Sequence, residues 1–186
     1  MRATVLSTLL AASAALPTAA SANLLTNGGF ETGDLSGWLC SGAPECRAAF
    51  GLPRTGFYHL QGYDNSGFAT LSQGIATTIG ETYLMSGWAA LSMVDPGNIL
   101  RFAAAGSTQT AVVTAPFTYT QTEMYFTAVA TTTIVEVLFE TDDLRGSWYV
   151  DDLSVVAAQA PSDVPLPAAA PLLLMGLGGL AALRRR

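Results

Sequence analysis

The stretch TTIVEVLFE, residues 132–140, alternates between two kinds of side chain with a period of two. In an extended chain, successive side chains point to opposite sides. The apolar side of this stretch carries Val135, Val137 and Phe139. The opposite side carries two glutamates, Glu136 and Glu140. Because charged side chains avoid a core, we expect the Val/Phe side to face a hydrophobic core, and the stretch predicts a half-buried β-strand.

Similar short runs fill residues 23–158, where no stretch sustains a helical period. Gly, Asn, Asp and Pro separate the runs at intervals of roughly ten residues, as in sandwiches and barrels. The other predicted strands are Phe68–Ile75, Tyr83–Leu91, Ile99–Ala104, Gln109–Thr114, Glu123–Ala128 and Trp148–Val156. A segment of this length can bury one sizeable core. The fold class predicted for residues 23–158 is therefore all-β, a β-sandwich.

The first 22 residues have the three-part pattern of a secretory signal peptide. Arg2 supplies the positive charge, an apolar run extends over about residues 5–16, and Ala20-Ser21-Ala22 supplies the small residues of a cleavage site. The run is short for a membrane-spanning helix. We therefore expect export and cleavage before Asn23. The alternative is a short buried helix at an ordinary N-terminus.

The charge of the middle of the chain argues against one class of partner. All fourteen acidic residues lie between Glu31 and Asp163, whereas four of the eight basic residues, Arg2 and Arg184–Arg186, lie in the end segments. The middle has 4 arginines against 14 acids and no lysine, a formal net charge of −10. Such a surface repels phosphate backbones, so we expect no nucleic acid partner. It suits divalent cations or neutral ligands, and a polyanionic glycan would need a bridging cation.

Cys40 and Cys46 are the two cysteines of the chain, and they flank a loop that contains Gly and Pro. In an exported chain, oxidation is favoured, so we predict a local disulfide between them. The alternative is a two-cysteine metal site, which lacks a nearby histidine or a further cysteine.

Two segments near the ends of the sandwich, NLLTNGGFETGDLSGW (23–38) and GSWYVDDLSVV (146–156), form a recognisable pair. Together they resemble the galactose-binding-like jelly-roll domains, especially bacterial carbohydrate-binding modules. ETYLMSGWAA (81–90) resembles the central strand of that family. The matching positions are Asn27, Gly28, Phe30, Glu31, Gly37, Trp38, Val150, Asp151 and Asp152. The resemblance implies a jelly roll whose first and last strands lie together.

The resemblance also implies a structural Ca²⁺ between these strands, with Glu31 and Asp151 as carboxylate ligands. Ca²⁺ typically binds about six to eight oxygen ligands, which carboxylates and backbone carbonyls can supply. Carbonyls of Gly28 and Gly29 and a group within residues 63–65 would complete the shell. The alternative is that Glu31 starts a turn and Asp151 caps an exposed edge.

Sugar binding would require exposed aromatic rings, because a planar ring packs against the apolar face of a pyranose. The candidates are Trp88, Trp148, Tyr125 and Tyr63. The alternative is that the tryptophans form the core, which we expect of Trp38 and leave open for the tryptophans at 88 and 148. The jelly roll also carries domains that bind proteins or no known ligand, so the resemblance does not transfer a ligand.

The residues give little support for an enzyme. The single histidine, His59, has no Ser or Cys nucleophile motif beside it, so we interpret it as a loop or strand histidine. The carboxylate pairs Asp142/Asp143 and Asp151/Asp152 are adjacent in sequence, and adjacent strand residues point to opposite faces. Neither pair is therefore expected to form a glycosidase-like dyad by itself.

The chain ends in a polar linker (159–163) and a tail (164–186). The tail consists of Val164-Pro165-Leu166-Pro167-Ala168, an apolar run to Leu183, and the arginines Arg184, Arg185 and Arg186. This order resembles a VPLPA-type PEP-CTERM sorting tail, which implies recognition by an exosortase-type membrane enzyme. The apolar run is at the lower margin for a spanning hydrophobic helix, and terminal arginines would stay cytoplasmic. The alternative is an ordinary C-terminal anchor.

We therefore expect an exported, non-catalytic jelly-roll protein that is tethered transiently to the inner membrane and then sorted to the cell surface or extracellular matrix. Its expected ligands are glycans of the envelope or matrix. The alternative is a structural or adhesive surface protein without a sugar site, and a glycan-active enzyme is the least favoured. Aromatic rings exposed around Trp88 and Trp148 would favour the first reading.

Overall fold

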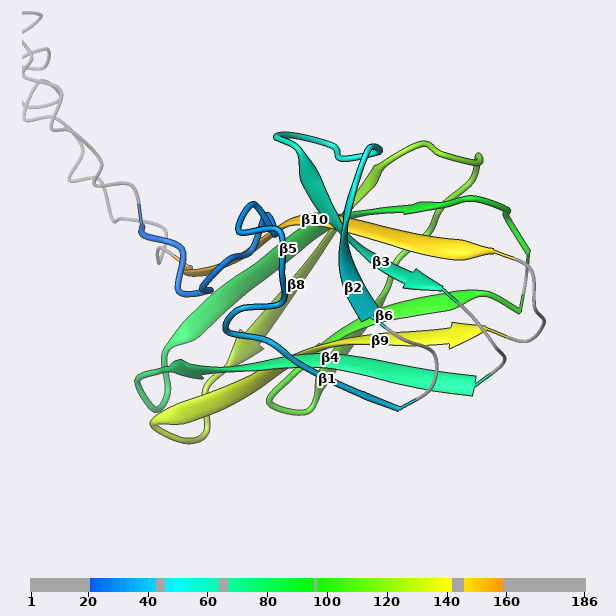
Figure 1. Ribbon diagram of the computed structural model, residues 1–186. Helices are drawn as coiled ribbons and strands as arrows, with labels where there is room; N and C mark the ends of the chain where they lie inside the picture. Colours follow the sequence, from blue (N-terminus) through cyan, green and yellow to red (C-terminus); the bar gives the residue numbers. More distant parts are fainter. Residues whose placement is uncertain (1–20, 43–45, 64–66, 96, 142–145, 159–186) are drawn as a thin grey trace, which may run out of the picture.

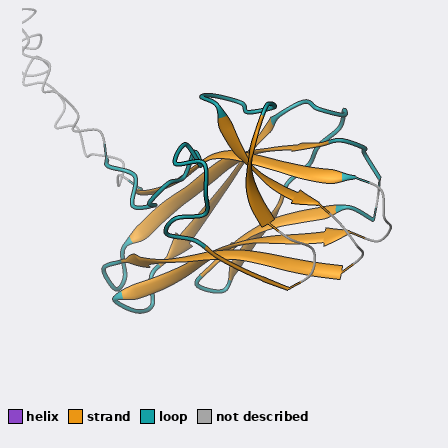
Figure 2. Cartoon of the chain, viewed as in Figure 1, coloured by secondary structure: helices purple, strands orange, loops and turns teal. Residues whose placement is uncertain are grey.

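The structure, a computed structural model, describes residues 21–42, 46–63, 67–95, 97–141 and 146–158. Every helix or strand assigned within these residues is a β-strand (Figure 2). In chain order the strands are β1 Leu39–Gly42, β2 Cys46–Phe50, β3 Tyr58–Tyr63, β4 Gly67–Ala76, β5 Thr82–Leu91, β6 Ile99–Ala104, β7 Ser107–Thr110, β8 Thr120–Thr127, β9 Thr132–Thr141 and β10 Ser147–Ala157.

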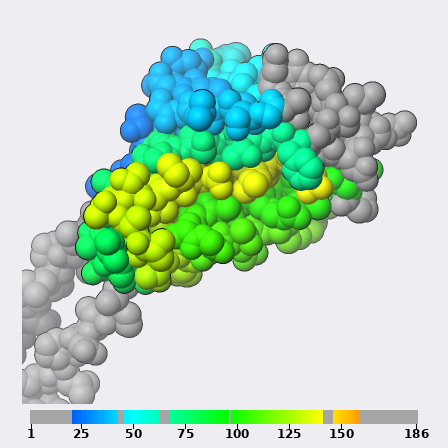
Figure 3. All heavy atoms as spheres, turned by 90° about the horizontal axis from the view of Figure 1, so that it is seen from below, coloured from blue at the N-terminus to red at the C-terminus, as the bar shows by residue number. Residues whose placement is uncertain are grey.

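The strands form two antiparallel sheets of five strands each. The first sheet has the order β1-β4-β9-β6-β7 and the second has the order β2-β3-β10-β5-β8. The sheets pack face to face (Figure 1), and Figure 3 shows the outer face of the first sheet as successive bands from blue β1 to green β6. Sequence neighbours repeatedly fall in different sheets, as in a jelly roll. The predicted all-β jelly-roll sandwich is confirmed.

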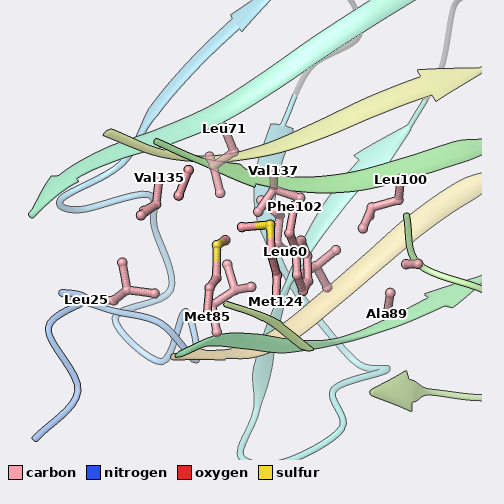
Figure 4. Close-up of a cluster of buried hydrophobic side chains, with 14 of the residues drawn as sticks. Leu25, Leu60, Leu71, Met85, Ala89, Leu100, Phe102, Met124, Val135 and Val137 are labelled. Carbon is pink, nitrogen blue, oxygen red and sulfur yellow. The ribbon is translucent and has the colours of Figure 1, made fainter. Parts of the chain in front are cut away.

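The core lies between the two sheets and explains the alternation of β9 (Figure 4). Val135, Val137 and Phe139 are at most 1% exposed, and β9 is the central strand of the first sheet. Their predicted inward orientation is confirmed. The second sheet contributes Leu60, Met85 and Met124 to the same cluster. The core also includes Trp38, as predicted.

Five predicted strands match β4, β5, β6, β9 and β10 closely, and β8 begins three residues earlier than expected. The strand predicted at 109–114 is wrong in position, because β7 begins at Ser107. Ala105 and Gly106 take left-handed φ values of +49° and +82°, which close a two-residue turn and pair Ser107 with Ala104. Residues 111–119 then form a loop that leads to β8.

Sequence analysis did not predict β1, β2 and β3. Their sequences LCSG, CRAAF and YHLQGY are short and lack a clear alternation of apolar and polar residues. Two of them are placed by pairing with a longer strand: β1 pairs with β4, and β3 pairs with β10. β2 then pairs with β3 at the edge of the second sheet.

The predicted disulfide between Cys40 and Cys46 is confirmed. Cys40 lies in β1 of the first sheet and Cys46 begins β2 of the second. The disulfide therefore joins the two sheets at one edge of the sandwich.

The start of the described chain lies against its last strand (Figure 1), but residues 23–38 form a loop and not the first strand that the resemblance implied. Leu24 N donates to Val155 O at 2.8 Å, and the side chain of Asn23 bonds Leu153 O and Val155 N. The predicted sorting tail (164–186) and nearly all of the predicted signal peptide (1–22) lie outside the described residues. Within the described ranges, no helix is long and apolar enough to cross a membrane.

Candidate functional site

A β-bulge in β10 brings two carboxylates to the same face of the second sheet. The register between β10 and β5 shifts between Asp151 and Ser154, and Asp152 has a left-handed φ of +50°. As a result, the side chains of Asp151 and Asp152 both accept hydrogen bonds from Thr55. The expectation that these adjacent residues point to opposite faces is therefore wrong, since it assumed a regular strand. The pair Asp142/Asp143 lies outside the described residues.

The two carboxylates hold the loop of residues 51–57, which connects β2 and β3 at the top of Figure 1. Asp151 Oδ2 accepts hydrogen bonds from Arg54 N at 2.8 Å and Thr55 N at 3.1 Å. Asp151 Oδ1 accepts one from Asp152 N at 2.7 Å. Asp151 is fully buried, and this burial raises its pKa to about 6 against the opposing effect of the three N–H donors. The buried carboxylate thus fixes the middle of the loop to β10.

Glu31 holds the far end of the same loop. Its carboxylate oxygens accept hydrogen bonds from the backbone N–H groups of Phe57 and Tyr58 at 3.0 Å. Gly56, with a φ of +67°, lets the loop wrap around the carboxylate, because a Cβ at this position would overlap Glu31 Oε1. Glu31 near the start of the domain and Asp151 in the last strand therefore both bind the backbone of this one loop.

This arrangement does not fit the expected calcium site. The oxygens of Glu31 and Asp151 face backbone N–H donors, whose partial positive charge occupies the positions a cation would need. The Gly28 carbonyl accepts a hydrogen bond from Leu153 N at 2.9 Å. Among the residues that the structure describes, no group of three or more His, Cys, Asp or Glu side chains could hold a metal. The calcium site that the resemblance implied stays a prediction.

Arg54 extends from the loop across the outer face of the second sheet. It forms an ion pair with Asp152 at 2.6 Å, and its guanidinium carbon lies 3.8 Å from the centroid of the Trp88 ring. Such stacking is a cation–π contact. The loop is thereby fixed to both β10 and β5.

Beside this loop lies a hollow of about 370 Å³ on the outer face of β2, β3 and β10, which we call the Tyr149 hollow. Its lining includes Arg47, Phe50, Leu52, His59, Gln61 and Tyr149. Arg47 donates from Nε and Nη2 to Gln61 Oε1 at 3.0 and 2.7 Å. The hollow combines apolar rings with hydrogen-bonding groups and has the size of a small-ligand site, about 300 Å³ or more.

A smaller cleft of about 140 Å³, the Phe117 cleft, continues on the other side of the Tyr149 ring. It lies between the loop of residues 51–57 and the loop of residues 111–119, and Tyr119 joins the two loops by donating its hydroxyl to Leu52 O at 2.8 Å. Burial, and then the charge of Asp151, raises the pKa of Tyr119, so the hydroxyl stays protonated as a donor. Leu52 lines both cavities.

Three rings form a row along these cavities. The ring centroids of Phe117 and Tyr149 are 5.9 Å apart, and those of Tyr149 and His59 are 5.2 Å apart. Phe117 is 56% exposed and has a left-handed φ of +53°, which is uncommon for a bulky residue. A strained backbone that presents an aromatic ring to solvent points to a functional position.

His59 lies at the buried end of this row. It is only 2% exposed, and neither ring nitrogen has a hydrogen-bond partner among the described residues. Burial, and then the charge of Arg47, lowers the pKa of His59, so its imidazole is neutral at pH 7. The histidine is thus a strand residue, as expected, and it has two polar atoms that the fold leaves unsatisfied.

The aromatic residues predicted from the sequence to bind a sugar do not lie together in the structure. Trp88 lies on the outer face of the second sheet, but Arg54 covers its ring. Trp148 is 1% exposed and belongs to the core, so of the two positions left open for it the core position holds and the sugar-binding one is wrong. It also borders a separate hollow. Tyr125 is 61% exposed but pairs with Leu84. Since Ala90 pairs with Tyr149, Tyr125 lies six strand residues away, roughly 20 Å.

Tyr63 ends β3, and its side chain lies outside what the structure describes. Sequence reasoning missed Phe50, Phe117 and Tyr149, and it did not connect His59 with a cavity. Tyr149 lies within the predicted strand Trp148–Val156, and its alternation with Trp148 and Val150 could have placed it on the outer face. Phe117 follows a proline in a loop, where no periodicity marks a binding residue.

No protein-family model and no curated protein matches the chain. Among solved structures, it is similar to a family 61 carbohydrate-binding module, TmCBM61, in complex with β-1,4-galactotriose, with 22% identity and a TM-score of 0.63 over 74% of this chain and 100% of that chain. It is also similar to the CBM22-1 xylan-binding domain from Paenibacillus barcinonensis Xyn10C, with 18% identity and a TM-score of 0.57 over 77% of this chain and 99% of that chain.

The fold is the jelly roll of carbohydrate-binding modules. A likeness to a MgGH51 α-L-arabinofuranosidase, with 14% identity and a TM-score of 0.52, covers 73% of this chain but only 26% of the enzyme. The two modules, by contrast, are covered over nearly their full length. At these identities the comparison speaks to the fold alone.

Proposed function

We propose that this protein is a non-catalytic glycan-binding protein whose binding face comprises the Tyr149 hollow and the Phe117 cleft. The observation that carries the proposal is the exposed ring of Phe117, which ends a row of rings with the buried Tyr149 and His59 on the outer face of the second sheet. Aromatic rings pack against the apolar face of a sugar, while polar groups beside them bind its hydroxyls.

Both kinds of group are present. Phe117 exposes its ring at one end of the row, and Tyr149 and His59 continue the row below the surface. Gln61 and Arg47 supply hydrogen-bonding groups at the same hollow. The named ligands of two similar modules, galactotriose and xylan, support a neutral or partly substituted glycan chain as the general class of ligand.

The test is a glycan array with the full-length chain, followed by calorimetry on a glycan that binds. Phe117→Ala should weaken binding about fivefold or more, since stacking on one aromatic ring is typically worth about 1 kcal/mol. Phe68→Ala is the matched control, because Phe68 is 62% exposed on the first sheet. Equal affinities of the two variants would contradict this site. A chain that binds no glycan would instead be a structural or adhesive surface protein.

We also propose that the protein is exported and sorted to the cell surface or matrix, where envelope or matrix polysaccharide would be its partner. The support is the order of segments in the sequence, with a signal-like segment at 1–22 and a VPLPA-type tail at 164–186. An exosortase-type enzyme would remove the tail after a transient stay in the inner membrane. Mass spectrometry of the surface-exposed protein should show a C-terminus upstream of the apolar run, and an intact Arg186 would contradict this processing.

A further inference from the structure

One end of the sandwich presents three apolar side chains to solvent. Val129 is 75% exposed, and Ile79 and Ile134 are each more than half exposed. Ile79 lies in the turn between β4 and β5, Val129 lies in the turn between β8 and β9, and Ile134 lies near the start of β9. We call these three side chains the apolar end patch.

The two turns are bound to each other, so the patch is one surface. Gly80 N donates to Ala128 O at 2.8 Å, and Ala128 N donates to Glu81 O at 3.0 Å. Ile134 pairs with Gly74 of β4, which has no side chain to cover it. Apolar side chains that gather at one place on a surface indicate a contact with a partner more than single scattered ones do.

The same end of the domain carries little charge. Residues 77–82 and 127–134 contain one charged side chain, that of Glu81, and are otherwise rich in threonine and small residues. The middle of the chain as a whole has 14 acids against 4 arginines. Anionic lipids give a membrane a negative surface potential, which repels an acidic surface. The apolar end patch therefore lies in a region of this acidic domain that can approach lipid headgroups.

The described chain also ends beside the patch. Ala158 donates its N–H to Thr82 O at 2.9 Å, three residues after Ile79. Figure 1 shows both turns and the end of β10 at the left of the molecule. The apolar run of the predicted tail begins at Ala168, and ten residues span at most about 35 Å. A tail inserted in a bilayer would therefore keep this end of the domain close to the lipid surface.

We propose that the apolar end patch docks on the bilayer that receives the C-terminal tail. Ile79 and Val129 enter the boundary between headgroups and acyl chains, and Ile134 borders them. The domain then stands on the membrane with this end down. The proposal rests on the proposed membrane tethering and names the surface of the domain that takes part in it.

Three apolar side chains bind a membrane weakly by themselves, but the tail changes this. A short tether gives the patch an effective concentration at the membrane of the order of millimolar. The apolar run of the tail is at the lower margin for a spanning helix, and stable anchoring of a weakly inserted chain takes a second membrane contact. The patch supplies that contact while the tail is attached, and removal of the tail releases the domain.

The experiment places a fluorescent probe in the patch. The full chain, with its tail intact, is reconstituted in vesicles of phosphatidylcholine and phosphatidylglycerol, with and without bromine on the acyl chains. Bromine quenches a tryptophan that reaches them, so Val129→Trp should lose more fluorescence than the original chain does. Phe68→Trp is the matched control and should lose no more than the original chain, because Phe68 is exposed at the far end of β4.

A second substitution tests the patch as a unit. Ile79→Asp, added to Val129→Trp, should remove the extra quenching, because a carboxylate is costly to move into the apolar region of a bilayer. Equal quenching of Val129→Trp and Phe68→Trp would overturn the docking surface, as would quenching that survives Ile79→Asp. A dimer of the original chain in detergent that Ile79→Asp abolishes would assign the patch to a second copy and also overturn it.

Flotation of the same vesicles measures the tether separately. A chain that floats with the vesicles but shows no extra quenching at position 129 overturns the docking surface and leaves the proposed tethering in place. A chain that does not float with the vesicles overturns both. The proposed glycan binding at the Phe117 cleft is independent of either outcome.

Discussion

At the scale of single residues, the loop of residues 51–57 depends on Gly56. Its φ of +67° is costly for any residue with a Cβ, and an added Cβ would overlap the Glu31 carboxylate. We expect Gly56→Ala to lower the free energy of unfolding by about 2–4 kcal/mol, measured by urea denaturation. Gly80→Ala is the control, because Gly80 has a φ of +86° but open space around it. If Gly56→Ala loses no more stability than Gly80→Ala, the overlap with Glu31 does not contribute to the destabilisation.

Asp151 gives a prediction about pH. Its pKa rises to about 6 from an ordinary value of 3.8, mainly because of burial. Between these two values the folded state binds more protons than the unfolded state, so this residue makes stability fall as pH rises from about 4 to about 6. Above the folded pKa the contribution is constant, and its full size is about 3 kcal/mol at most.

The variant Asp151→Asn isolates this effect, because other carboxyls titrate in the same range in both proteins. The free energy of unfolding of the original chain, minus that of the variant, should decrease between pH 4 and pH 7. Urea denaturation at four pH values in this range measures it. A difference that stays constant with pH would mean that the folded environment does not raise the pKa of Asp151.

At the scale of elements, β1 and β2 depend on the disulfide between Cys40 and Cys46. Both strands are short edge strands, and each pairs with only one neighbour. Replacing both cysteines with alanine should lower the free energy of unfolding by about 2 kcal/mol, the chain-entropy value for so short a loop. Reductant should produce the same loss in the original chain and no further loss in the variant. Equal stability of all forms would contradict a stabilising link between the sheets.

The same elements show what sequence can predict. Strands such as β9 and β5 were predicted because one face is buried, and burial gives a period of two that is visible in the residues themselves. β1 to β3 carry no such pattern, because their place is decided by pairing with β4 and β10, which are far away in sequence. Local residues cannot encode a partner that lies roughly 30 positions further on, as for β1, or roughly 90, as for β3.

The candidate site was predictable only in part for the same reason. The resemblance identified Asp151 as a site residue. Its role of holding the loop of residues 51–57, however, depends on the bulge that brings it against Arg54 and Thr55. Likewise, Phe117 and His59 lie more than fifty positions apart, and only the fold places both beside Tyr149. Exposed rings and an unsatisfied histidine are properties of packing, so no spacing in the sequence indicates them.

At the scale of the whole molecule, the charge of the domain decides how a calcium test must be designed. A middle segment with a net charge of −10 gains stability from any divalent cation by screening, even without a site. A higher melting temperature in Ca²⁺ is therefore not enough to show a site. A specific site adds RT ln(1 + [L]/Kd), about 2.7 kcal/mol at a concentration one hundred times Kd, on top of screening.

We expect melting temperatures in millimolar Ca²⁺ and in chelator to differ by the same small amount in the original chain and in Asp151→Asn. The reason is that the oxygens of Asp151 and Glu31 accept backbone N–H groups and hold the loop of residues 51–57 without a metal. Mg²⁺ at equal concentration should reproduce the effect of Ca²⁺, since screening depends on charge. A shift of several degrees that requires Ca²⁺ and disappears in Asp151→Asn would establish the calcium site that the resemblance implied, and the loop would then be held by a cation.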